Sequence, residues 1–147
     1  MNQIKKNAVL ILVILLFVSC KNSNEQKTEI TTDEHTSQNS LDWPGTYKGT
    51  LPCADCEGIE KIIQINEDNT YSLKSTYLGK GKKEEFDETG TFTWNKEGNT
   101  ITTIPKDKSI SQSYFIGEKK LIQLNNENKI ITGPLADFYI LKQIKSR

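Results

Sequence analysis

The stretch at residues 70–77, TYSLKSTY, alternates between two kinds of side chain. Tyr71, Leu73, Ser75 and Tyr77 form one set, and the residues between them are threonine, serine and lysine. Because successive side chains of a β-strand point to opposite faces of a sheet, this alternation predicts a strand with its aromatic face buried. The chain is therefore expected to build a sheet around this stretch.

The same alternation recurs outward in both directions, and no window from Leu41 onward keeps a helical period over three turns. Phe92 and Trp94 alternate with threonines. We predict an all-β fold. Further strands are expected at residues 46–51, 59–65, 100–104, 113–116, 120–124, 129–131 and 138–144.

Short connectors rich in Asn, Gly, Asp and Glu separate these runs, so neighbouring strands should form hairpins. About eight strands in a meander commonly close on themselves, because closure removes exposed edges. The sequence thus predicts a small antiparallel β-barrel, either packed solid or enclosing one small apolar guest. The expected interior residues are Tyr47, Ile63, Ile65, Tyr71, Leu73, Phe92, Trp94, Ile101, Leu124, Phe138 and Ile140.

Between two of these strands lies a Cys-x-x-Cys motif, in LPCADCEGI at residues 51–59. A structural zinc site would need two further Cys or His ligands, and beyond the first segment of the chain only His35 is present. A thioredoxin-type pair would need a helix after the first cysteine, whereas residues 59–65 are isoleucine-rich and favour a strand. In an oxidising compartment we expect a Cys53–Cys56 disulfide, worth about 2 kcal/mol by the chain-entropy relation.

Three neighbours of the cysteines are candidate supports of this loop. Asp55 could tune a thiol, contact a metal or accept backbone N–H bonds in a tight turn. Pro52 limits the freedom of the backbone, and Gly58 lets the chain turn into the next strand.

The first segment has the layout of a bacterial lipoprotein signal peptide. Two lysines precede an apolar run at residues 8–18, which ends in Ser19-Cys20. The run is about half of the ~20 residues that a spanning helix needs. We expect a signal peptide at residues 1–19, a lipidated Cys20 that begins a disordered tether at residues 20–40, and a barrel domain at residues 41–147. His35 then lies in the tether as a solvated residue.

A family resemblance adds to this interpretation. YKGTLPCADCEGI at residues 47–59 closely resembles the signature of the NlpE family of outer-membrane lipoproteins. DNTY at residues 68–71 and YLG at residues 77–79 match further elements, and GTFTW at residues 90–94 fits loosely. The resemblance covers residues 43–144. It implies a lipocalin-like barrel, and a lipid anchor in the outer membrane that leaves the protein facing the periplasm or the outside.

The resemblance also implies a non-catalytic role in copper resistance and in signalling envelope or surface-contact stress, with an envelope signalling protein as partner. Two soft thiolates suit Cu(I), so reduced Cys53 and Cys56 are candidate copper ligands. We find no catalytic motif, and 19 basic against 19 acidic residues give no reason to expect nucleic acid. The alternatives are a lipocalin-like carrier of a small hydrophobic ligand with a purely structural disulfide, and a thiol oxidoreductase.

Overall fold

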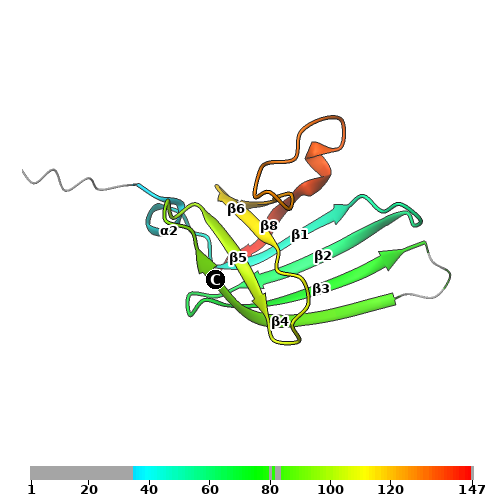
Figure 1. Ribbon diagram of the computed structural model, residues 1–147, viewed down its shortest axis with the longest axis horizontal. Coiled ribbons are helices and arrows are strands. Elements are labelled where there is room, and N and C mark those ends of the chain that lie inside the picture. The colour runs from blue at the N-terminus through cyan, green and yellow to red at the C-terminus, as the bar shows by residue number, and fades with distance from the viewer. Residues whose placement is uncertain (1–34, 80, 82–83, 147) are drawn as a thin grey trace, which may run out of the picture. The chain divides into compact units, whose positions relative to one another are not determined.

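A computed structural model describes residues 35–79, 81 and 84–146, and the first segment with Cys20 lies outside these residues. The described part is a closed barrel in which each strand pairs with its sequence neighbours and β8 pairs with β1 (Figure 1). All of the pairings are antiparallel, which confirms the predicted class. The strands are β1 (Gly45–Leu51), β2 (Gly58–Ile65), β3 (Thr70–Leu78), β4 (Glu84–Trp94), β5 (Thr100–Pro105), β6 (Ser113–Gly117), β7 (Lys120–Gln123) and β8 (Ile140–Ser146). None of the helices within those described residues has the length and apolar character needed to cross a bilayer.

Turn chemistry closes the hairpins much as expected. Between β2 and β3, Asn69 adopts a φ of 60°, a left-handed conformation that Asn tolerates better than most residues. Asp68 accepts bonds from both the backbone N–H and the hydroxyl of Thr70, at 3.0 and 2.6 Å. This local network sets the register of the β2–β3 pairing, in which Ile65 faces Tyr71.

Two predicted strands near the C-terminus need correction. Residues 129–131 form no strand, and only an isolated bridge links Leu124 to Ile130. The strand predicted at residues 138–144 begins at Ile140, because the 3-10 helix η2 (Ala136–Tyr139) occupies its first two positions. Phe138 is consequently 53% exposed, so its assignment to the interior was wrong.

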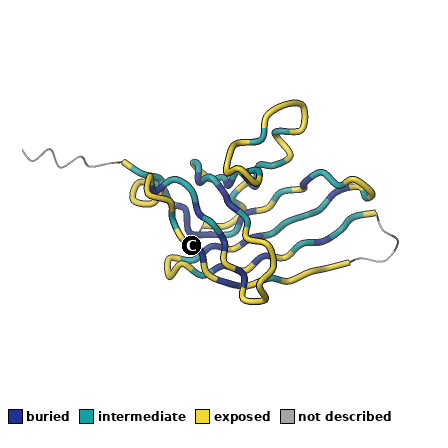
Figure 2. The backbone as a smooth tube through the Cα atoms, in the orientation of Figure 1, coloured by how far each residue is buried: buried dark blue, intermediate teal, exposed yellow. Residues whose placement is uncertain are grey.

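The core confirms most of the other interior assignments. Eight of the eleven predicted residues are buried, while Trp94 and Ile140 are half-buried. Figure 2 shows buried and less buried positions interleaved along the strands, with exposed stretches at the loops and along the outer part of β4. Six buried hydrophobic residues were not predicted: Trp43, Leu51, Tyr114, Ile116, Leu121 and Leu141.

A short helix covers one end of the barrel. α2 (Ser37–Ser40) begins with a capping box between Thr36 and Asn39. The Ser37 hydroxyl donates to the carbonyl of Ile116 at 2.8 Å, and the Gln38 N–H donates to the carbonyl of Gly98 at 2.9 Å. Residues 37–40 were expected to belong to the tether, whereas in the structure Ser37 bonds to strand β6 and Gln38 bonds to the β4–β5 turn.

The strands β1 to β4 extend further at the opposite end, where the connection from β1 to β2 carries the two cysteines (Figure 1). β4 pairs with β5 only from Gly90 onward, whereas it pairs with β3 along residues 84–91. The inner face of this long sheet therefore continues past the shorter strands of the other wall.

Candidate functional site

The candidate site begins at the cysteine loop, residues 52–57, which joins the end of β1 to the start of β2. Leu51 and Ile59 form the last pair of the β1–β2 ladder and fix the two ends of the loop. Cys53 and Cys56 are joined by a disulfide with their Cα atoms 5.3 Å apart. Both cysteines are half-buried, so the bridge remains accessible to a reductant.

Asp55 brings a carboxylate beside the two sulfurs. One ligand atom each from Cys53, Asp55 and Cys56 can be chosen so that all lie within 4.8 Å of one another. The Sγ atom of Cys53 lies 3.5 Å from Oδ1 of Asp55, which is a contact and not a hydrogen bond because a disulfide sulfur carries no proton. Reduction would convert this loop into a site with two soft donors and one hard donor. Within the described part of the chain, no other group of three His, Cys, Asp or Glu residues has this spacing.

The loop is supported by the end of β3. The YLG motif at residues 77–79 spans this end and is separate from the cysteine motif in the sequence. The backbone N–H of Glu57 donates to the carbonyl of Leu78 at 3.1 Å, and Gly58 pairs with Leu78. Gly79 has a φ of 76°, and a Cβ atom there would lie 2.5 Å from Cγ of Glu57. The two signature segments CEGI and YLG are thus one packed unit in space.

Gly58 and Pro52 flank the loop on its two sides. Gly58 is buried, and a Cβ atom at this position would come within 2.8 Å of Cγ2 of Thr50. Pro52 follows the last residue of β1 and is half-buried. Both placements are compatible with the supporting roles predicted for these residues, and those roles remain predictions.

A second group of polar residues lies on the inner face of the barrel and was not singled out in the sequence. Glu88 accepts hydrogen bonds from Oη of Tyr71 and from Oγ of Ser109, each at 2.7 Å. The Lys61 ammonium donates to Oε1 of Gln123 on β7 at 3.2 Å. Burial lowers the pKa of Lys61, and the nearby Glu88 charge opposes this effect. Extending the period-2 pattern of β2 backward from Ile63 would have placed Lys61 inside.

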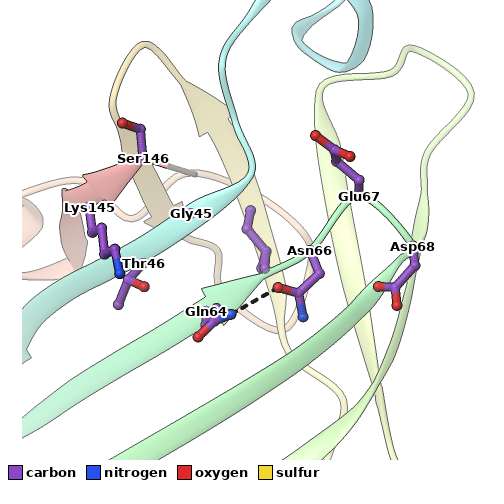
Figure 3. Close-up of a pocket in the computed structure, with 9 residues that line it drawn as sticks. Gly45, Thr46, Gln64, Asn66, Glu67, Asp68, Lys145 and Ser146 are labelled. Atoms are coloured by element: carbon purple, nitrogen blue, oxygen red, sulfur yellow. Dashed lines mark hydrogen bonds between the residues drawn. The ribbon is translucent and has the colours of Figure 1, made fainter.

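A surface hollow of about 370 Å³ lies at the other end of β1, away from the cysteines (Figure 3). Its polar groups are largely engaged by the β2–β3 turn: Gln64 donates to Asn66 at 3.0 Å, and Asn66 donates to Thr70 at 3.0 Å. We therefore assign no function to it. His35 is exposed and lies in none of these places.

Comparison with known proteins connects this geometry to a family. The sequence model described as the NlpE N-terminal domain matches residues 47–134. The chain is 34% identical to Lipoprotein NlpE of Escherichia coli over 67 residues, which cover 45% of this chain and 28% of that protein. It is 32% identical to the 17 kDa lipoprotein of Treponema pallidum over 111 residues, which cover 69% of this chain and 70% of that protein.

Solved structures show the same architecture. A candidate lipoprotein from Shewanella oneidensis matches with a TM-score of 0.67 and 46% identity, over 75% of this chain and 96% of that one. The Cpx pathway activator NlpE from Escherichia coli matches with a TM-score of 0.52 and 27% identity, over 61% of this chain and 46% of that one. The chain thus corresponds to about half of the NlpE crystal structure or less, and to most of the Shewanella protein.

Proposed function

The chain belongs to the family defined by the NlpE N-terminal domain, and from this membership we propose that it is a non-catalytic, lipid-anchored envelope lipoprotein. Its role would be in copper resistance and in signalling envelope or surface-contact stress to an envelope partner. Its relatives are themselves named as lipoproteins, which supports a lipid anchor at Cys20. The absence of an acidic residue after Cys20 favours the outer membrane, since Lys21 follows it.

The observation that carries the proposal is the convergence of two sulfurs and one carboxylate on an accessible loop. Cu(I) prefers soft sulfur donors and tolerates low coordination numbers, whereas a structural zinc ion would need a fourth protein ligand. The donor set therefore fits copper better than zinc. Cys53 and Cys56 would hold the metal, and Asp55 would lie beside it as an additional charge.

The same pair supplies a two-state redox element. Two electrons and two protons from an external dithiol reduce the Cys53–Cys56 bond to two thiols, and the reductant leaves as a disulfide. Each thiol releases a proton when its sulfur becomes a ligand. Only the reduced loop can hold a metal, so copper binding and thiol state are linked.

Anaerobic titration of the reduced protein against a competing Cu(I) chelator tests this function. We expect the Cys53→Ser/Cys56→Ser variant to bind Cu(I) at least about tenfold more weakly, which corresponds to about 1.4 kcal/mol or more. Asp55→Asn is the matched control, because it keeps both sulfurs and should have the smaller effect. Equal affinities of wild type and the double variant would show that the disulfide is only a structural brace.

The anchor is tested separately by fractionation of cells. Cys20→Ala protein should leave the membrane fraction, since two or three acyl chains at this residue would otherwise hold it there. Continued incorporation of labelled fatty acid into the Cys20→Ala protein would contradict this assignment.

A further inference from the structure

The inner face of β1 to β4 changes from buried to accessible as it approaches the cysteine loop. The β2–β3 register places Ile63 opposite Leu73, then Lys61 opposite Ser75, and then Ile59 opposite Tyr77. Ile63 is fully buried and Leu73 is nearly so, whereas the four residues nearer to the loop are half-buried. The inner wall is therefore less deeply buried from Lys61 to the loop than it is at Ile63 and Leu73.

Lys61 is a cation at this boundary without a direct counter-charge. Its ammonium bonds to the neutral amide of Gln123, and no carboxylate within the described residues lies within ion-pair distance of it. The outer face of the same sheet is different: Lys48 pairs with Glu60 at 3.0 Å, and Lys74 pairs with Glu85 at 2.7 Å. A partly desolvated cation is costly unless a charge of opposite sign compensates it.

Glu88 is the carboxylate whose charge acts on Lys61, but both of its oxygens already accept hydrogen bonds. One oxygen accepts from Tyr71 and the other accepts from Ser109. Glu88 therefore affects Lys61 only through the electrostatic field of its negative charge, which raises the pKa of Lys61. This field also matters for selectivity, because a nearby negative charge disfavours a multiply charged anion more strongly than a monoanion.

Apolar side chains line the wall above Lys61. Ile59 and Tyr77 form the pair next to it, and Phe86 stands opposite Ser75 on β4. The exposed Glu84 stands opposite Tyr77 at the outer end of the same face. The rings of Tyr77 and Phe86 meet edge to face with centroids 5.6 Å apart. Phe86 remains 57% exposed although its register places it on the inner face. Exposed aromatic surface beside a cation that has no ion-pair partner among the described residues is complementary to a molecule with an anionic head and an apolar tail.

We propose that this inner face binds a small monocarboxylate amphiphile, with the carboxylate on Lys61 and the tail against Ile59, Tyr77 and Phe86. This inference goes beyond the copper function and does not depend on it. It differs from a lipocalin-like carrier of a small hydrophobic ligand in one respect: the ligand carries a negative charge, and Lys61 favours that charge over a neutral or positive head group.

Isothermal titration of the full-length purified protein with octanoate, 1-octanol and octylammonium tests the site, since the three probes share one tail. We expect saturable binding of octanoate that is at least about tenfold tighter than that of the other two. Lys61→Met should remove this preference while leaving 1-octanol binding within about twofold, and Lys61→Arg should restore part of it.

Two control variants separate this site from other effects. Lys74→Met removes a cation from the outer face of the same sheet, and it should bind octanoate like the wild type. The Cys53→Ser/Cys56→Ser variant should also bind octanoate normally, so failure of the copper function and failure of this site are distinguishable. Absence of saturable octanoate binding, equal affinity for octanoate and 1-octanol, or unchanged binding by Lys61→Met would each overturn the proposal.

Discussion

Two buried tyrosines show that a buried hydroxyl group can either stabilise or destabilise the barrel. The Tyr47 hydroxyl donates to the carbonyl of Trp43 at 2.6 Å, whereas the Tyr114 hydroxyl is buried without a partner in the described structure. A satisfied buried hydrogen bond contributes about 1 kcal/mol, and an unsatisfied polar group costs about 1–3 kcal/mol. The two side chains therefore have opposite effects at their hydroxyl groups.

We predict that Tyr47→Phe lowers the free energy of unfolding by about 1 kcal/mol, because it leaves the carbonyl of Trp43 without its donor. Tyr114→Phe, the matched control, should be neutral or stabilising, since it removes a hydroxyl that has no partner. Urea unfolding of both variants measures the difference. A loss of stability in Tyr114→Phe as large as that in Tyr47→Phe would contradict the assignment.

Gly79 and Gly81 provide a second matched pair. Both have positive φ, 76° and 47°, so alanine is strained at either position. Only at Gly79 would the new Cβ atom meet Glu57, at 2.5 Å, whereas nothing lies within 4 Å at Gly81. Gly79→Ala should therefore destabilise by about 1–2 kcal/mol more than Gly81→Ala, because the cysteine loop must shift. Equal losses in urea unfolding would show that the contact with Glu57 relaxes at no cost.

Among the elements, α2 contributes more than its four residues suggest. It bonds to the carbonyl of Gly98 in the β4–β5 turn and to the carbonyl of Ile116 in β6, and the carbonyl of Gln38 accepts from Nε1 of Trp43 at 2.9 Å. Trp43 in turn packs edge to face on Trp94, with centroids 5.2 Å apart. The helix therefore holds a tryptophan in place at this end of the core.

We predict that a chain beginning at Leu41 has a free energy of unfolding about 2 kcal/mol lower than a chain beginning at His35. The shorter chain loses several part-buried hydrogen bonds, each of which contributes about 0.5–1.5 kcal/mol. Tryptophan emission should also shift toward longer wavelength in the shorter chain. Identical stability and emission would indicate that residues 35–40 contribute nothing to the barrel.

The strands also show what the sequence could and could not reveal. β1 to β3 were predicted closely, because one face of each is buried and the period-2 pattern is therefore present in the sequence. Residues 84–89 of β4 were missed, since they pair only with β3 and all except the half-buried Glu88 are exposed, which leaves no alternation of buried and exposed positions in the sequence. Phe138 was misplaced because a short apolar run does not distinguish a strand from a 3-10 helix. The cysteine loop was visible as a motif, whereas its contact with Gly79 required the hairpin register.

At the scale of the whole molecule, three interior tyrosines set the stability of the barrel in alkaline solution. Burial is the largest cause that raises the pKa of Tyr47, Tyr71 and Tyr114, and neighbouring carboxylates add to it. The unfolded state therefore loses these protons at lower pH than the folded state. Each tyrosine contributes stability that is intact below about pH 10 and is lost as the pH rises further.

We expect the free energy of unfolding to fall above about pH 10, with a slope of up to about 1.4 kcal/mol per pH unit for each tyrosine. The lowered pKa of Lys61 acts in the opposite direction, so the three tyrosines decide the sign. Urea unfolding at a series of pH values measures the slope, and Tyr114→Phe should reduce it. A stability that rises between pH 10 and pH 12 would be incompatible with this burial.

The overhang of β4 beyond the shorter wall has one more consequence, which concerns self-association. Closure gives the strands hydrogen-bonded neighbours on both sides along the ring, but residues 84–88 have a strand partner on one side only. Within the described residues no strand pairs with this segment on the side away from β3, and such an edge can template an additional strand. The sequence there is EEFDE, and its four carboxylates would repel a second copy of the same edge. We therefore expect the acidity of this segment to disfavour edge-to-edge polymerisation.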